Sequence, residues 1–173
     1  MDILISSNLE RLLAFSAGAA KTVEYMAKLK SEGAYTVGRE VLNAIDKDFK
    51  GYFATEENTS ETIKETLDET NNLIDTHTAV GLFAANKYIA ETSDTTTVTV
   101  VASTASPFKF ASDVYSSITG EIPSDGLAAL DLLTEKTGVD IPYPLKGIAE
   151  RKVRFTETIN SDEMPEKVLD FAN

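Results

Sequence analysis

Apolar residues recur at the spacing of an α-helix along most of the chain. Residues 59–74 give the clearest case. Their inward side advances in steps of four, three and four residues, through Ile63, Leu67, Thr70 and Ile74. The same spacing, often with a capping residue before it or a glycine after it, predicts further helices. These cover residues 9–15, 19–32, 38–48, 77–88, 106–118, 125–136 and 161–173.

The spacing also predicts which side chains are buried. In residues 106–118 the expected buried face is Phe108, Ala111, Tyr115 and Ile118. In residues 19–32 it is Val23, Met26, Ala27 and Leu29. Short polar residues before a helix and glycine after it mark the expected ends. The expected N-caps are Ser106, Ser124 and either Ser7 or Asn8, and the expected stops are Gly33 and Gly138.

Three short stretches have the pattern of β-strands instead. Residues 97–103 contain Val98, Val100 and Val101, a β-branched run typical of a central strand covered on both faces. Residues 2–6 form a second candidate, and residues 152–158 alternate as an edge strand does. The expected fold is therefore α/β, mainly helical with two or three short strands. We expect residues 1–173 to form a single unit, because no linker or repeat divides them.

A turn rich in hydroxyl groups follows the predicted central strand. It contains Ser103, Thr104 and Ser106, and Pro107 then fits the first position of the next helix. In open α/β sheets, ligands bind just beyond the carboxyl ends of strands. The turn is thus a candidate binding site. A simpler alternative is that its hydroxyl groups only cap the helix.

The charge balance excludes some classes of partner. The formal net charge is −12, with 28 acidic and 16 basic residues, which argues against nucleic acid and against an anionic membrane surface. No apolar run approaches the roughly 20 residues needed to span a bilayer, and no signal peptide is recognised at the N-terminus. The chain contains no cysteine, so it has no disulfide framework. We expect a cytoplasmic protein without nucleic-acid or membrane partners.

The candidate metal ligands are few. His77 is the only histidine, so a zinc site is not expected. Asp75 or Thr76 can cap the helix that His77 opens, and a histidine fixed by this cap is the simpler interpretation of His77. The acidic residues between positions 56 and 69 have no recognised ligand spacing, and they fit a solvated helix face. The sequence therefore predicts no metal site.

Three segments carry a resemblance to a known family. Residues 103–110 read STASPFKF, residues 1–13 read MDILISSNLERLL, and residues 75–81 read DTHTAVG. They resemble the segments STASPYKF or TAHPxKF, SMDILxSSNLERL and DPHTAVG of threonine synthases, in the same order. Those enzymes are lyases of threonine biosynthesis that use pyridoxal phosphate (PLP) and have the type II fold. Thr76 stands where the family has proline, and Phe108 where it often has tyrosine.

The resemblance implies roles for particular residues. Thr104 matches the hydroxyl residue that meets the pyridine nitrogen of PLP, and it is the expected cofactor-binding residue. Five others are expected on the substrate side of the site: Ser6, Ser7, Asn8, His77 and Lys109. For the residues at positions 6–8, a helix N-cap is the simpler interpretation. The family reaction converts O-phospho-L-homoserine and water to L-threonine and phosphate.

The resemblance also covers only the C-terminal part of the family. The lysine that forms the internal aldimine and the glycine-rich phosphate loop lie upstream in the family, and this chain has neither. Lys109 is not that lysine, so no catalytic residue is assigned. We expect a fragment that is inactive and binds no PLP by itself, whose partner is the missing N-terminal portion or, through residues 97–103, a second copy. The alternative is a free-standing helical protein-interaction module without catalytic activity.

Overall fold

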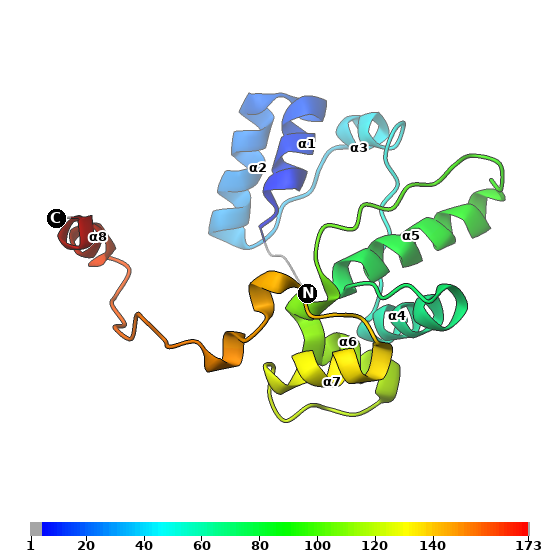
Figure 1. Cartoon of the computed structure of the whole chain (residues 1–173). Coiled ribbons are helices and arrows are strands. Elements are labelled where there is room, and N and C mark those ends of the chain that lie inside the picture. Colours follow the sequence, from blue (N-terminus) through cyan, green and yellow to red (C-terminus); the bar gives the residue numbers. More distant parts are fainter. Residues whose placement is uncertain (1–4, 173) are drawn as a thin grey trace. The chain divides into compact units, whose positions relative to one another are not determined.

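The structure, a computed structural model, describes residues 5–172 and is mainly helical (Figure 1). The described part contains eight α-helices and three short 3-10 helices. They are α1 (Ser7–Ala17), α2 (Ala19–Glu32), α3 (Arg39–Ile45), α4 (Glu56–Thr70), α5 (Thr76–Thr92), η1 (Pro107–Phe110), α6 (Ala111–Thr119), α7 (Ala128–Thr137), η2 (Tyr143–Leu145), η3 (Ile148–Glu150) and α8 (Met164–Ala172). No helix within residues 5–172 is both long and apolar enough to cross a membrane.

The helices group into two compact units. The first unit contains α1, α2 and α3 together with Gly81–Val100, and the second contains Glu56–Val80 and the chain after Val100. Helix α5 is continuous, so its first turns belong to the second unit and its remainder to the first. The expectation that the chain folds as a single unit stays a prediction.

The core of the first unit is small. Its buried apolar residues are Leu13 on α1, Tyr25 on α2 and Val41 on α3, and Tyr35 stacks on Tyr25 with ring centroids 5.4 Å apart. The predicted range of α2 is confirmed, and its predicted buried face is right in part: Met26 packs against the core and Leu29 is half-buried, but Val23 and Ala27 are exposed. Thr22 and Tyr25 are buried, whereas Val23 is 68% exposed. The Tyr25 ring buries more apolar area than the Val23 side chain would. The side of α2 that carries Tyr25 therefore faces α1.

The core of the second unit is larger. Helix α6 packs between α4 and α7, and each contributes fully buried side chains, including Ile63, Val114 and Leu133. The predicted buried face of residues 106–118 is confirmed in all four positions. The buried core as a whole is Ile63, Ala79, Phe108, Ala111, Val114, Tyr115, Ile118, Ala129, Leu130 and Leu133.

Most helix ends follow their capping chemistry. Ser106 is the N-cap of η1, and Gly33 and Gly138 end α2 and α7 with left-handed φ of 75° and 72°. Two predicted caps are wrong. Ser6, rather than Ser7 or Asn8, caps α1. Asp125, rather than Ser124, accepts the first free N–H groups of α7, because a carboxylate reaches two amides at 2.7 and 2.9 Å.

The predicted strands are wrong for the residues that the structure describes. Residues 97–103 form no strand, and Val98 and Val100 are each 85% exposed instead of buried. Residues 152–158 also form no strand, and of residues 2–6 only the last two are described, without strand structure. A strand requires a neighbour for its backbone N–H and C=O groups. The described chain supplies none, so valine content alone does not produce one.

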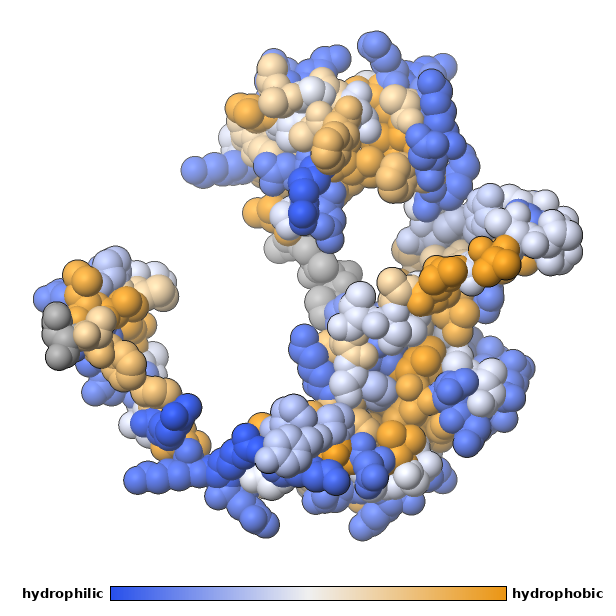
Figure 2. Space-filling model, turned by 45° about the horizontal axis from the view of Figure 1, so that its top comes forward, coloured by the Kyte–Doolittle hydropathy of each residue, from blue (hydrophilic) through white to orange (hydrophobic). Residues whose placement is uncertain are grey.

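The C-terminal segment carries apolar side chains that remain exposed. Within it, Phe155 meets Phe171 edge-on at 5.8 Å, and Lys167 pairs with Glu157 at 2.5 Å. This ion pair lowers the pKa of Glu157 and raises that of Lys167. Apolar surface is visible on this segment, at the left of Figure 2. The exposed large apolar residues of this segment are Val153, Phe155, Ile159, Met164, Val168, Leu169 and Phe171.

Candidate functional site

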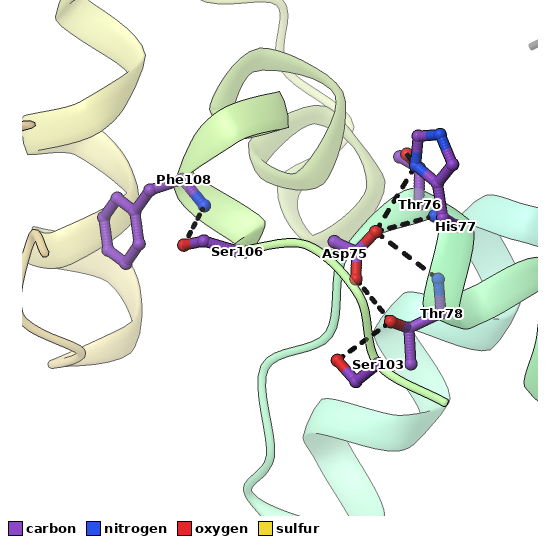
Figure 3. Close-up of polar contacts among 7 residues, drawn as sticks. All are labelled: Asp75, Thr76, His77, Thr78, Ser103, Ser106 and Phe108. Atoms are coloured by element: carbon purple, nitrogen blue, oxygen red, sulfur yellow. Dashed lines mark hydrogen bonds and ion pairs between the residues drawn. The ribbon is translucent and has the colours of Figure 1, made fainter. Parts of the chain in front are cut away.

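The candidate site is built around a buried carboxylate at the start of α5. Asp75 is fully buried, and its Oδ1 accepts the backbone N–H groups of His77 at 2.9 Å and of Thr78 at 3.4 Å (Figure 3). Its Oδ2 accepts the Thr78 hydroxyl. These bonds satisfy the first free N–H groups of the helix, as an Asp N-cap does. One of the two proposed caps, Asp75, is thereby confirmed.

The same network reaches the hydroxyl-rich turn. The hydroxyl groups of Thr78 and Ser103 are 3.0 Å apart, although 25 positions separate them in sequence. Figure 3 shows Ser103 lying directly beside Thr78 and Asp75. The turn that follows residue 102 is therefore tied to the N-terminus of α5 by side chains.

The other end of the turn is fixed by Ser106. Its Oγ accepts the N–H of Phe108 at 3.3 Å, and its carbonyl accepts the N–H of Lys109 at 3.0 Å. Pro107 occupies the first position of η1, and the buried Phe108 anchors the helix in the core. This confirms the capping role predicted for Ser106. The turn from 103 to 106 is thus held at both ends.

Thr104 lies between these two fixed ends. It is exposed, and among the described residues its hydroxyl has no hydrogen-bond partner. A threonine hydroxyl can donate one hydrogen bond and accept others. Thr104 therefore fits a neutral partner for a heteroaromatic ring nitrogen, which is the part expected of it in PLP binding.

Two of the expected substrate-side residues meet at one aromatic ring. The His77 ring lies 4.8 Å from the Phe110 ring, and the Lys109 Nζ lies 5.3 Å from the centre of the Phe110 ring. His77 Nδ1 also lies 3.4 Å from Asp75 Oδ1 and from Thr76 Oγ1, with 37% of the side chain exposed. The site therefore presents an imidazole and an ammonium group that are partly open to solvent.

The other expected substrate-side residues belong to the first unit and lie at the start of α1, where Ser6 is the N-cap. The Ser6 Oγ accepts the N–H of Leu9 at 3.4 Å. Arg11 donates to the Ser7 carbonyl at 3.2 Å and to the Asn8 Oδ1 at 2.5 Å. These contacts support the simpler interpretation that the segment caps a helix. A role of Ser6, Ser7 or Asn8 toward substrate stays a prediction.

Within the described residues, no group of acidic or histidine side chains is arranged to hold a metal ion. The acidic residues of α4 are exposed, as a solvated face requires. Elsewhere, burial and the hydrogen bond to Glu121 raise the pKa of Tyr115. Hydrogen bonds from the side chain and backbone of Thr97 and from Thr96 lower the pKa of Asp94.

Sequence analysis missed the parts played by Thr78 and Phe110. A signal for Thr78 is present, since a threonine three positions after a capping aspartate can return a hydrogen bond to it. No sequence signal identifies Ser103 as its partner, because that contact spans 25 positions. Phe110 was not distinguishable from the other aromatic residues of the core.

The fold is that of the C-terminal third of a known class of enzymes. The structure of PLP-bound threonine synthase from Brucella melitensis matches 99% of this chain, with a TM-score of 0.70 and 29% identity, over 33% of its own length. The threonine synthase from yeast matches 98% of this chain, with a TM-score of 0.75 and 29% identity, over 35% of its own length.

Sequence comparison agrees with the structural match. The family described as "Threonine synthase, C-terminal" matches residues 78–169. The threonine synthase of Saccharomyces cerevisiae is 36% identical over 135 residues, and that of Schizosaccharomyces pombe is 34% identical over 122 residues. This chain belongs to the threonine synthase family. The matches cover 69% and 64% of this chain but only 26% and 24% of those relatives.

Proposed function

We propose that this chain supplies the C-terminal part of a threonine synthase. In that role it serves an enzyme that converts O-phospho-L-homoserine and water to L-threonine and phosphate with PLP. The observation that carries the proposal is the turn at residues 103–106. It is held at both ends by side-chain hydrogen bonds, yet it leaves the Thr104 hydroxyl free and exposed.

The Thr104 hydroxyl fits the ring nitrogen of the cofactor. PLP supplies an electron sink for the carbon atoms of the bound amino acid. Thr104 would contact this sink with a neutral hydroxyl and so would add no charge at the ring nitrogen. In this chain it is the residue assigned to hold the cofactor.

Lys109 and His77 are suited to the substrate's anionic groups. O-phospho-L-homoserine carries a phosphate and a carboxylate, and an ammonium group binds such oxygens as a compact point charge. The Lys109 Nζ and the His77 ring each lie against the Phe110 ring, which supports a substrate-side role for both. His77 can donate from its ring as well, in a manner that depends on its protonation state.

The remaining parts of the enzyme would come from a partner chain segment. The proposal requires an upstream portion with the PLP lysine and the phosphate loop, and this chain alone should bind PLP only weakly. Exposed Val98, Val100 and the C-terminal segment offer apolar surface to such a portion. A cytoplasmic location, self-association through residues 97–103, and the alternative of an interaction module stay predictions.

A reconstituted enzyme tests the proposal. In it, this chain replaces the matching C-terminal segment of the S. cerevisiae threonine synthase. Phosphate release from O-phospho-L-homoserine is measured together with the visible absorption of bound PLP. We expect activity, and we expect Thr104→Val to lower kcat about tenfold, because one hydrogen bond of about 1.4 kcal/mol is lost.

Ser106→Ala serves as the matched control. Ser106 is two residues away and also carries a hydroxyl, but its hydroxyl is used for capping. It should lower kcat less than Thr104→Val does, because the Ser106 carbonyl still accepts the N–H of Lys109 and keeps the turn anchored, and no contact to the cofactor is lost. Equal losses from the two changes, or a folded reconstituted enzyme without activity, would count against the proposed function.

A further inference from the structure

The contact between Thr78 and Ser103 links the start of α5 to the hydroxyl-rich turn, and the proposed function gives neither of these two side chains a role. Thr78 is buried and contacts both the Asp75 carboxylate and the Ser103 hydroxyl. Its backbone N–H is already engaged by Asp75. The Thr78 side chain is therefore not needed to cap the helix, since the carboxylate caps it through the backbone.

The direction of these hydrogen bonds follows from the donors available. An ionised carboxylate only accepts, and the Thr78 hydroxyl carries a single proton. That proton is donated to Asp75 Oδ2, so the Thr78 oxygen is left to accept from Ser103. The chain of donors then runs from Ser103 through Thr78 to Asp75. Each hydroxyl in it has one preferred orientation, which fixes the side chain of Ser103.

Fixing Ser103 constrains the residue that follows it. Ser103 directly precedes Thr104, and Ser106 pins the backbone two residues after Thr104. With both flanks held, few backbone conformations remain for Thr104. Without the Thr78 contact, the turn keeps only its downstream anchor.

We propose that Thr78 is a positioning residue, which holds the 103–106 turn through Ser103 and so places the Thr104 hydroxyl at the ring nitrogen of the cofactor. This inference rests on the proposed function. It assigns Thr78 no contact with substrate or cofactor. It makes Asp75 the buried acceptor on which the placement depends.

Thr78→Val tests the turn in the 173-residue chain itself. Valine has nearly the same shape and removes both hydroxyl contacts, while the backbone cap from Asp75 remains. We expect the backbone order parameters of residues 103–105, measured by NMR relaxation, to fall clearly, with little change at His77 and Thr78. Thr62→Val is the matched control, because Thr62 is also buried and donates to a backbone carbonyl, of Asn58, at 2.7 Å. It should leave the order parameters of residues 103–105 unchanged, and Thr78→Ser should restore them to the values of the unaltered chain.

The reconstituted enzyme tests the consequence for Thr104. Thr78→Val should lower kcat about three- to tenfold and shift the absorption band of bound PLP in the same direction as Thr104→Val. The double variant should be no slower than Thr104→Val alone, because the two residues act on one contact. Additive losses, or a band identical to that of the unaltered enzyme, would overturn the inference.

The two proposals fail in different ways. If the unaltered reconstituted enzyme folds but binds no PLP, the proposed function fails, and the placement of Thr104 at a ring nitrogen fails with it. If that enzyme is active and Thr78→Val leaves both residues 103–105 and the PLP band unchanged, only the positioning role fails.

Discussion

Helix α6 and the segment that precedes the hydroxyl-rich turn are similarly apolar and have opposite fates. In α6 every residue of the predicted apolar face is buried, between α4 and α7. In residues 97–101, Val98 and Val100 are almost fully exposed. The difference shows that a run of apolar side chains is not buried by its composition alone. Burial also depends on whether other elements of the chain pack against it. Residues 97–101 are apolar without a partner in the described chain.

The largest effect should come from the packed side of this comparison. Leu133→Ala removes a fully buried side chain from the core of the second unit and should cost about 2–5 kcal/mol of unfolding free energy. Val98→Ala should cost less than about 0.5 kcal/mol, because the side chain is already in water. Chemical denaturation followed by circular dichroism measures both. Similar costs for the two changes would show that residue 98 is covered in solution.

A charged substitution in residues 97–101 tests whether this exposed apolar segment is an interface. Val100→Asp should leave the stability of the chain nearly unchanged but weaken its association at least about tenfold, because a carboxylate would enter an apolar contact. Analytical ultracentrifugation measures self-association, and titration with the separate upstream part of the S. cerevisiae enzyme measures assembly. Val100→Thr, which keeps the shape and adds no charge, is the control. Unaltered assembly in both experiments would exclude this segment from the interface.

A smaller effect should arise at the cap between the two regions. Ser106→Ala removes the oxygen that accepts the N–H of Phe108, at the point where the packed helices begin. It should lower the unfolding free energy by about 1 kcal/mol. Ser31→Ala on the exposed face of α2 provides a comparison, because alanine favours a helix and little is lost there. An unchanged midpoint for Ser106→Ala would mean that the core holds η1 without its cap.

The smallest effect concerns pH and the loop that leads into residues 97–101. The Asp94 carboxylate accepts the N–H groups of Thr96 and Thr97 at 3.2 and 3.0 Å, and its pKa is lowered from the ordinary 3.8. A carboxyl group whose pKa is lower in the folded than in the unfolded chain stabilises the folded state at pH values above its unfolded pKa. That stabilisation is lost as the pH falls through its folded pKa. Amide exchange at Thr96 and Thr97, corrected for intrinsic rates, should therefore accelerate below about pH 3.8. Asp94→Asn should abolish this pH dependence, and a dependence that persists in the variant would implicate another group.

Sequence reasoning succeeded where structure is decided locally. The positions of α2 and α6, the Ser106 cap and the Gly33 and Gly138 stops all follow from interactions within a few residues. Sequence reasoning failed where the local structure depends on contacts with residues distant in sequence. Residues 97–103 have the composition of a central strand, but strand formation depends on neighbours that the described chain lacks.

The candidate site shows the same division. Asp75 as a cap could be predicted, since the residue and the amides it accepts lie within three positions. The link from Thr78 to Ser103 could not, because it spans two segments joined only by the fold. The contact between the His77 and Phe110 rings is likewise tertiary, whereas Lys109 reaches Phe110 as its neighbour in sequence. The family resemblance predicted a substrate-side role for His77 and Lys109, but it did not predict that both contact the Phe110 ring.

Helix α5 has a consequence for how the chain melts. Its first turns contribute Ala79 to the core of the second unit, and its later turns belong to the first unit, where Tyr52 donates a hydrogen bond to Glu91. Starting a helix is much harder than extending one, so the later turns rely on the nucleus formed by the earlier ones. Loss of the second unit's core should therefore fray α5 from its beginning. Thermal unfolding that starts at residues 75–79 would then spread to the part of the helix near Glu91, before any contact near Glu91 is broken.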